Sequence, residues 1–325
     1  MSENTTTTAV DSDVSAMESV QFILLLIIEV FAGVWILVIL VYFGRNYHRI
    51  FSKNLRDHGF FLLTVLSFLY ITLDLPFTIN SFRLGYDQPR SETFCKYWYW
   101  IDYSIIVSSS FLTAIISIQR HILIFNAACF NRPRCRFLLH YIPLILCLLC
   151  PTIGYFILLY LYPCQNSSDE YLVYCPSPCY SWNRILYHID WILDTIVPVG
   201  GIIISNLVLI FRVIRSLRKL RGKRSLMLKR QRKLTIELLV ISSLYALGWG
   251  PSTVVGVIQD LFVPDIFERV PTLSYTYYMS YFVCPLQPFL YLIMSSEIMA
   301  FIKQGIQRLF TWNIVAPESV NRRIY

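Results

Sequence analysis

Seven long apolar stretches, separated by short polar or charged segments, dominate the sequence. Each can supply the roughly 20 residues that an α-helix needs to cross the hydrocarbon core of a bilayer. Most are too long for the strands of a membrane barrel, which alternate over about ten residues. The pattern therefore predicts an all-α, polytopic membrane protein with a seven-transmembrane helix bundle. The stretches cover approximately residues 21–43, 59–82, 95–125, 137–162, 190–214, 234–259 and 270–294.

Polar segments at both ends of the chain flank this bundle. Residues 1–20 lack a basic start followed by an apolar core, so they indicate an extracellular N-terminal tail and no cleaved signal peptide. Residues 21–294 then form the seven-transmembrane domain. For residues 295–325 we expect a short amphipathic helix after the seventh span and a short cytoplasmic tail.

The composition agrees with a membrane protein and excludes other classes. Hydrophobic residues make up 56% of the chain and charged residues only 15%, whereas ordinary soluble domains hold about 25% charged residues. A soluble protein this apolar would expose large hydrophobic patches. Intrinsic disorder is excluded because it requires low hydrophobicity and high charge.

Basic residues gather in alternate loops and predict the orientation of the chain. With the N-terminus outside, 23 of the 28 Lys and Arg residues fall in cytoplasmic segments, as the positive-inside rule requires. We therefore expect a multi-pass plasma-membrane protein with an extracellular N-terminus and a cytoplasmic C-terminus. The basic residues behind the net charge of +8 are then expected to lie against anionic membrane lipids. Nucleic acid is therefore not a predicted partner.

Cysteines and glycosylation sequons agree with this orientation. Asn4 and Asn166 each open an N-x-S/T sequon on the predicted outer side, where the protein would be a glycoprotein. An oxidising compartment also favours disulfides. Four of the nine cysteines lie in predicted extracellular segments, namely Cys95, Cys164, Cys175 and Cys179.

Catalytic and cofactor motifs are not evident in the sequence. It contains no Gly-rich phosphate loop and no H-E-x-x-H motif, so we expect neither an enzyme nor a bound cofactor or metal. A membrane transporter or channel of an unrelated seven-span type stays open as an alternative. Many transporters consist of paired repeats, and no internal repeat is evident here.

Residues at the ends and bends of spans three to seven resemble a known pattern. The two ends of the third span, Cys95 and Arg120, are 25 residues apart, or about 37 Å of helix. The other matching residues are Pro198 in the fifth span, Trp249 and Pro251 in G-W-G-P, and Pro288 and Tyr291 in Q-P-F-L-Y. In order and spacing, the pattern over about residues 20–310 resembles a rhodopsin-like (class A) G-protein-coupled receptor.

The sequence departs from that family pattern at several positions. The triplet at the end of the third span reads Gln-Arg-His, with Gln119 where the family has an acid. Gln287 replaces the asparagine before the seventh-span proline. Ser109 matches the serine of the family's sodium site, but Asp74 lies one or two turns outward of the matching aspartate position. The chain therefore resembles a divergent member, and the displaced aspartate argues against a sodium site.

The resemblance implies an extracellular ligand and a heterotrimeric G protein as partners. Asp102 matches the position at which aminergic and several peptide receptors hold a cationic ligand, and Tyr281 matches the tyrosine that bonds this aspartate. Asp190 and Asp194 form an i,i+4 pair, and a carboxylate in hydrocarbon costs roughly 2.5–3.5 kcal/mol, so it is expected to face the bundle interior. Alternatively, Asp102 is an internal hydrogen-bond anchor and the pair is wetted by headgroup water. The expected ligand-binding residues are Asp102, Asp190, Asp194, Trp249, Tyr277 and Tyr281.

The predicted ligand is a short basic or amidated peptide, with a biogenic amine second. Aminergic receptors usually place two aromatic residues after the sixth-span proline, where this chain has Ser252 and Thr253. The wide second outer loop and the tyrosines near Tyr281 suit a peptide better. The resemblance also implies a disulfide between Cys95 and this loop. The chain distance to Pro198 favours Cys175, with Cys164 and Cys179 as alternatives.

The resemblance assigns activation and G-protein coupling to the inner half of the bundle. Arg120 would meet the G protein, while Trp249, Pro251, Pro288 and Tyr291 would move the helices. Because Gln119 cannot hold Arg120 as an acid would, we expect ligand-free signalling that Gln119→Asp lowers. The acid Glu237 in the sixth span is an alternative partner for Arg120.

Overall fold

The computed structural model describes residues 4–48, 55–89, 91–125, 127–130, 132–164, 175–219, 225–263 and 266–315, and every element in these residues is helical. Apolar stretches become helices because a helix satisfies its own backbone hydrogen bonds in hydrocarbon. Within the described residues, six helical spans are long and apolar enough to cross a membrane. They are Ser19–Arg45, Asp57–Leu84, Glu92–Arg120, Pro133–Leu161, Arg184–Arg212 and Leu239–Leu261.

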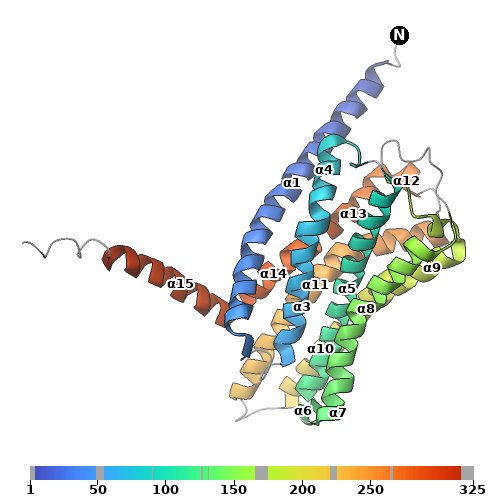
Figure 1. The fold of residues 1–325 in the computed structure, drawn as a ribbon. Coiled ribbons are helices and arrows are strands. Elements are labelled where there is room, and N and C mark those ends of the chain that lie inside the picture. Colours follow the sequence, from blue (N-terminus) through green and yellow to red (C-terminus); the bar gives the residue numbers. More distant parts are fainter. Residues whose placement is uncertain are drawn as a thin grey trace, which may run out of the picture.

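These spans overlap the first six predicted stretches and consist of the following elements (Figure 1). The first is α1 (Asn4–Arg45), and the second combines α3 (Leu55–Leu69), η1 (Tyr70–Asp74) and α4 (Leu75–Leu84). The third is α5 (Glu92–Phe125), and the fourth combines α7 (Pro133–Arg136), η2 (Phe137–Tyr141), α8 (Ile142–Phe156) and η3 (Ile157–Leu161). The fifth combines α9 (Arg184–Trp191), η6 (Ile192–Ile196) and α10 (Val197–Lys219), and the sixth is α11 (Ser225–Leu261).

The seventh predicted stretch is broken into short segments. Tyr275–Met294 is paired with a second helix that bends away by 80°. The segments are η7 (Pro271–Ser274), α13 (Tyr275–Tyr278), η8 (Met279–Phe282) and α14 (Val283–Met294). A proline clashes with the carbonyl four residues earlier, and for Pro285 that carbonyl belongs to Tyr281 inside η8. The tighter turn of η8 therefore lies where a regular helix is disfavoured.

Both ends of the chain are more helical than the sequence pattern suggested. α1 begins at Asn4, so it includes most of the polar segment that we assigned to a tail. After the bend, α15 (Ser296–Val315) leaves the bundle (Figure 1). It is held to α1 by the Tyr42 hydroxyl, which donates to Glu297 at 3.3 Å, and by the ring of Phe301, 5.4 Å from that of Tyr42.

Four π-helical turns occur in the described residues, and each ends two residues before a proline. Proline lacks an N–H and clashes with the carbonyl four residues earlier, so the wider π turn accommodates it. In each case the residue before the proline donates its N–H to the carbonyl five residues back. The pairs are η1 with Pro76, η2 with Pro143, η3 with Pro163 and η6 with Pro198.

The third span forms the centre of the bundle. It is the most buried of the six spans and the first span is the least buried. α5 packs against α3, α8, α10 and α11, and α11 packs in turn against α14. The end of the bundle that carries Cys95 includes α9 and α12 (Ile266–Arg269). The opposite end, which carries Arg120, includes α6 (Ala127–Phe130) and α7 (Pro133–Arg136) (Figure 1).

Candidate ligand-binding site

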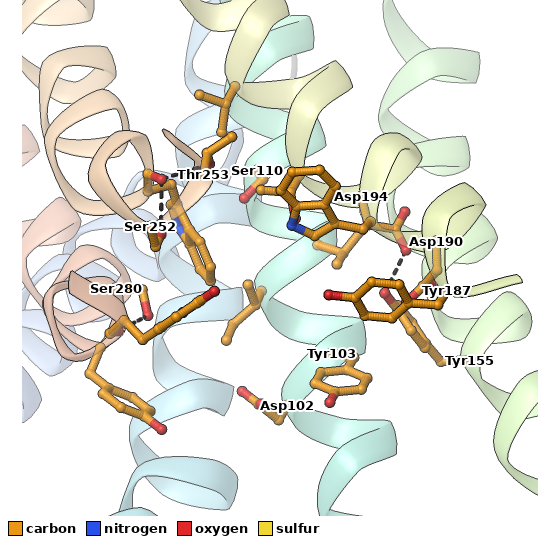
Figure 2. Close-up of a pocket in the computed structure, with 18 residues that line it drawn as sticks. Asp102, Tyr103, Ser110, Tyr155, Tyr187, Asp190, Asp194, Ser252, Thr253 and Ser280 are labelled. Carbon is orange, nitrogen blue, oxygen red and sulfur yellow. Dashed lines mark hydrogen bonds between the residues drawn. The ribbon is translucent and has the colours of Figure 1, made fainter. Parts of the chain in front are cut away.

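A cavity of about 350 Å³ lies between spans three, five, six and seven. We call it the central cavity. Figure 2 shows Asp102 and the Asp190–Asp194 pair reaching it from different helices, with Ser252 and Ser280 on another side. All six residues that the sequence assigned to ligand binding line this cavity, namely Asp102, Asp190, Asp194, Trp249, Tyr277 and Tyr281.

Asp102 presents a buried carboxylate oxygen without a partner. Its Oδ1 atom makes no hydrogen bond in the described part of the chain. The bond to Tyr281 that the resemblance implied is not formed between these described residues, although both line the central cavity. A buried polar atom without a partner is costly, so Asp102 Oδ1 is available to accept a hydrogen bond at the cavity.

A second cavity of about 330 Å³ shares Asp102 and Tyr281 with the central cavity. We call it the outer cavity, because Cys175 and Gly85 also line it. Trp98 lines it too and donates its indole N–H to Asp74 at 2.6 Å. Asp102 and Tyr281 therefore stand between two hollows, and a ligand at Asp102 could extend into either.

The Asp190–Asp194 pair is held by two tyrosines. The Tyr155 hydroxyl donates to Asp194 at 2.5 Å, and the Tyr180 hydroxyl donates to Asp190 at 3.1 Å. Burial raises the pKa of the Tyr180 phenol, and the neighbouring Asp190 raises it further, so Tyr180 remains a neutral donor. No Lys or Arg is among the described residues that line the central cavity. The cavity is therefore acidic and without a basic counter-ion of its own.

The sixth-span wall of the central cavity carries two hydroxyl groups that are bonded to their own helix. Ser252 and Thr253 donate their hydroxyls to the carbonyl of Trp249, at 2.9 and 2.7 Å. These two positions therefore supply small side chains bonded to their own helix, and they leave space beside Trp249. This geometry agrees with the sequence, which has no aromatic residues at these two positions to enclose a ligand.

A disulfide ties the second outer loop to the start of α5. Cys95 and Cys175 are joined with their Cα atoms 5.5 Å apart, the pairing that the chain distance favoured. The Cys175 N–H also donates to Asp87 at 2.6 Å, and the Tyr99 hydroxyl donates to the Cys175 carbonyl at 2.9 Å. Cys164 pairs with Cys179. The loop segment at Cys175 is thus positioned by three contacts as one wall of the outer cavity.

Polar contacts continue from the central cavity toward Arg120. Ser109 Oγ lies 3.5 Å from Cys284 Sγ, and the Tyr245 hydroxyl donates to Gln287 at 2.7 Å. Both contacts are buried and join the third, sixth and seventh spans beside Pro251 and Pro288, which lie inside α11 and α14. The residue at the position of the family's sodium-site serine therefore contacts a thiol.

Arg120 and Tyr291 come together through a residue that the sequence did not single out. The ring of Phe60 stacks on Tyr291 with 4.4 Å between centroids, and the Arg120 guanidinium lies 5.4 Å from the same ring. Arg120 is only 3% exposed. No sequence motif marked Phe60, because only the packing of α3 against α14 brings it there.

The side chain of Gln119 contacts residues of the fourth span. Its amide nitrogen donates to the Leu139 carbonyl at 2.9 Å, and its amide oxygen lies 3.0 Å from His140 Nδ1. His140 Nε2 lies 3.1 Å from His58 Nδ1. The Gln119 side chain thus joins α5 to the fourth span, and the effect of Gln119→Asp on Arg120 stays a prediction.

Three predicted positions have side chains that the structure does not describe. Asn166 lies outside the described residues. Asn4 begins α1, but its side chain, like that of Glu237, is not among those described. Toward the Arg120 end, Cys129 is joined to Cys135, a pairing that the sequence did not predict.

Comparison with known families identifies the chain. A family model described as 7 transmembrane receptor (rhodopsin family) matches residues 36–291. A comparison with curated proteins found no match. The family match favours a receptor over the alternative of an unrelated transporter or channel. The chain belongs to the rhodopsin family of seven-transmembrane receptors, the class A G-protein-coupled receptors, which respond to extracellular ligands through G proteins and are not enzymes.

Proposed function

We propose that this receptor binds a cationic ligand between Asp102 and the Asp190–Asp194 pair. The observation that carries the proposal is the Asp102 Oδ1 atom, which is buried at the cavity without a partner. A ligand ammonium or guanidinium would supply a charge-assisted hydrogen bond to it, and such bonds are about twice as strong as neutral ones. The acidic pair on the fifth span would receive a second donor group.

A short basic or amidated peptide is the favoured ligand, and a biogenic amine is second. The central and outer cavities meet at Asp102 and Tyr281, and together they offer more room than one small amine fills. A peptide could place its cationic group at Asp102 and continue past the Cys175 wall. The small residues Ser252 and Thr253 leave the central cavity poorly enclosed for a small amine.

Ligand binding would act on a G protein through the contacts that lead to Arg120. Trp249 lines the cavity one turn above Tyr245, whose hydroxyl bonds Gln287. Pro251 and Pro288 weaken the two helices there, since each removes a backbone hydrogen bond. A shift at Trp249 would therefore alter the contacts around Phe60, Tyr291 and Arg120.

The receptor would face the cell exterior with its Cys95 end. Arg132, Arg134 and Arg136 are exposed near the Arg120 end, as expected for a surface against cytoplasmic lipid headgroups and a G protein. In this orientation the Cys95–Cys175 and Cys164–Cys179 disulfides lie in the oxidising compartment. Glycosylation of Asn4 and Asn166 belongs to the same proposal.

The experiment is a screen of basic peptides and biogenic amines, read as nucleotide exchange on G proteins in receptor membranes. For the best ligand, Asp102→Asn is expected to raise the half-maximal concentration by at least about 30-fold, since losing a buried charged partner costs about 2–5 kcal/mol. Surface expression should be unchanged.

Glu92→Gln is the matched control. Glu92 is an exposed carboxylate paired with Lys96 on the same helix as Asp102, so its loss should leave the response intact. An unchanged dose–response curve for Asp102→Asn would assign Asp102 to the structural role of a hydrogen-bond anchor.

A further inference from the structure

A groove of about 550 Å³ lies on the outer face of the bundle, between the fourth and fifth spans and against α5. We call it the lateral groove. Its rim is formed by Leu146, Ile189 and Leu193, whose side chains are about half exposed. Because these residues belong to membrane spans, the groove opens toward lipid hydrocarbon.

The lateral groove and the central cavity share part of their walls. Tyr155, Asp190 and Asp194 line both of them. Apart from these three residues and two cysteines, the described lining of the groove consists of apolar side chains, prolines and a glycine. Two carboxyl groups thus lie where an apolar groove meets the acidic cavity.

No described basic residue lies at this junction of the groove and the cavity. The carboxyl groups of Asp190 and Asp194 contact each other, and the hydroxyls of Tyr155 and Tyr180 donate to them. No Lys or Arg lines either hollow in the part of the chain that the structure describes. Acidic residues at membrane depth normally face a partner or a water-filled cavity. The occupant that complements both features has a cationic head and a hydrocarbon tail.

We propose that the lateral groove binds the hydrocarbon tail of an amphiphilic amine from the membrane, whose ammonium group lies at Asp190 and Asp194. This inference rests on the proposed cationic ligand of the central cavity and adds a lipid-soluble class of ligand to it. Two π turns widen the helices near the shared residues, since η3 begins two residues after Tyr155 and η6 contains Asp194.

Gly154 gives a direct way to fill the groove. It lines the groove on α8, and a Cβ atom added to it meets nothing within 4 Å. Gly154→Leu would therefore add side-chain volume to the groove from a position where the Cβ atom has open space. Gly44→Leu is the matched control, because Gly44 also has open space on a membrane helix but lies on α1, away from the groove.

The binding experiment compares butylamine and dodecylamine in vesicles that contain the full-length receptor, with partition into the lipid measured separately. Gly154→Leu is expected to weaken dodecylamine binding at least tenfold and to leave butylamine binding unchanged. Gly44→Leu should change neither. Equal dodecylamine binding by the parent and Gly154→Leu would overturn the groove proposal. If Asp102→Asn weakens the binding of both amines, the result reports on the cationic site of the central cavity and not on the groove.

Cys150 provides a second measurement that does not depend on a substitution. It is a free, exposed cysteine that lines the groove. Dodecylamine is expected to slow its labelling by a membrane-permeant maleimide, followed by peptide mapping, while dodecanol, with the same tail and no charge, should not. Equal protection by dodecanol would show that the groove holds any hydrocarbon, and the proposal of an amine site would be wrong.

Discussion

At the scale of single residues, two glycines of one helical turn distinguish a tight helix contact from open space. A Cβ atom on Gly248 would overlap the Val283 side chain of α14, while a Cβ on Gly250 meets nothing within 4 Å. Gly248→Ala is therefore expected to destabilise the receptor by about 1–3 kcal/mol, as overpacking does. Thermal unfolding of the purified protein measures this, with Gly250→Ala as the neighbouring control. Equal midpoints for the two variants would contradict the close approach of α11 and α14.

Gln119 gives a second prediction at this scale. Gln119→Asp removes the amide that donates to the Leu139 carbonyl and places a carboxylate near that acceptor. We expect a loss of about 1–3 kcal/mol of stability from the unpaired group, measured as a lower thermal midpoint. The control is Ile118→Val on the exposed side of the same turn. A stable variant with lower ligand-free nucleotide exchange would instead support the lock that the sequence suggested.

At the scale of elements, the prolines decide where the acidic residues point. The π turn η6 inserts the equivalent of one extra residue before Pro198, and one residue corresponds to about 100° of helix rotation. The direction in which Asp190 and Asp194 face the cavity therefore depends on a π turn that a regular helix would not contain.

Pro198→Ala restores the missing N–H donor and allows η6 to become a regular helix. This is expected to rotate Asp190 and Asp194 away from their present partners and to weaken the cationic ligand at least about tenfold, or roughly 1.4 kcal/mol. Pro143→Ala, which follows η2 in the same way near the Arg120 end, is the control. Dose–response curves at matched surface expression test this, and equal potency for both variants would contradict it.

Much of the architecture follows from sequence patterns, and the exceptions have physical causes. Span positions and the location of Asp102 follow from hydrophobic length and helix register. The prolines that follow the π turns mark their positions in the sequence, but the turns were not predicted from them. The contacts of Gln119 with His140 and of Phe60 with Arg120 were missed, because they depend on which helix faces bring distant residues together. The lateral groove likewise arises only from packing between spans.

At the scale of the whole molecule, positive and negative charges are separated along the bundle. Exposed arginines are more numerous near the Arg120 end, although Arg83, Arg184 and Arg269 are exposed toward the other end. The described cavities nearer Cys95 are lined by Asp87, Asp102 and the Asp190–Asp194 pair. A field of this sign attracts cations toward the cavity mouth and repels anions. We infer that the distribution which orients the chain in the membrane also assists capture of the proposed ligand.

The unpartnered oxygens of Asp102 and Asp74 bear on how the receptor is handled in the laboratory. In detergent, the empty protein would carry unsatisfied buried acceptors and would be the fragile form, so the choice of purification buffer becomes an experimental variable. A ligand at 100 times its Kd adds about 2.7 kcal/mol of stability. We expect a longer shelf life with a bound cationic peptide or amine, and no such gain in Asp102→Asn, as followed by size-exclusion chromatography over days of storage.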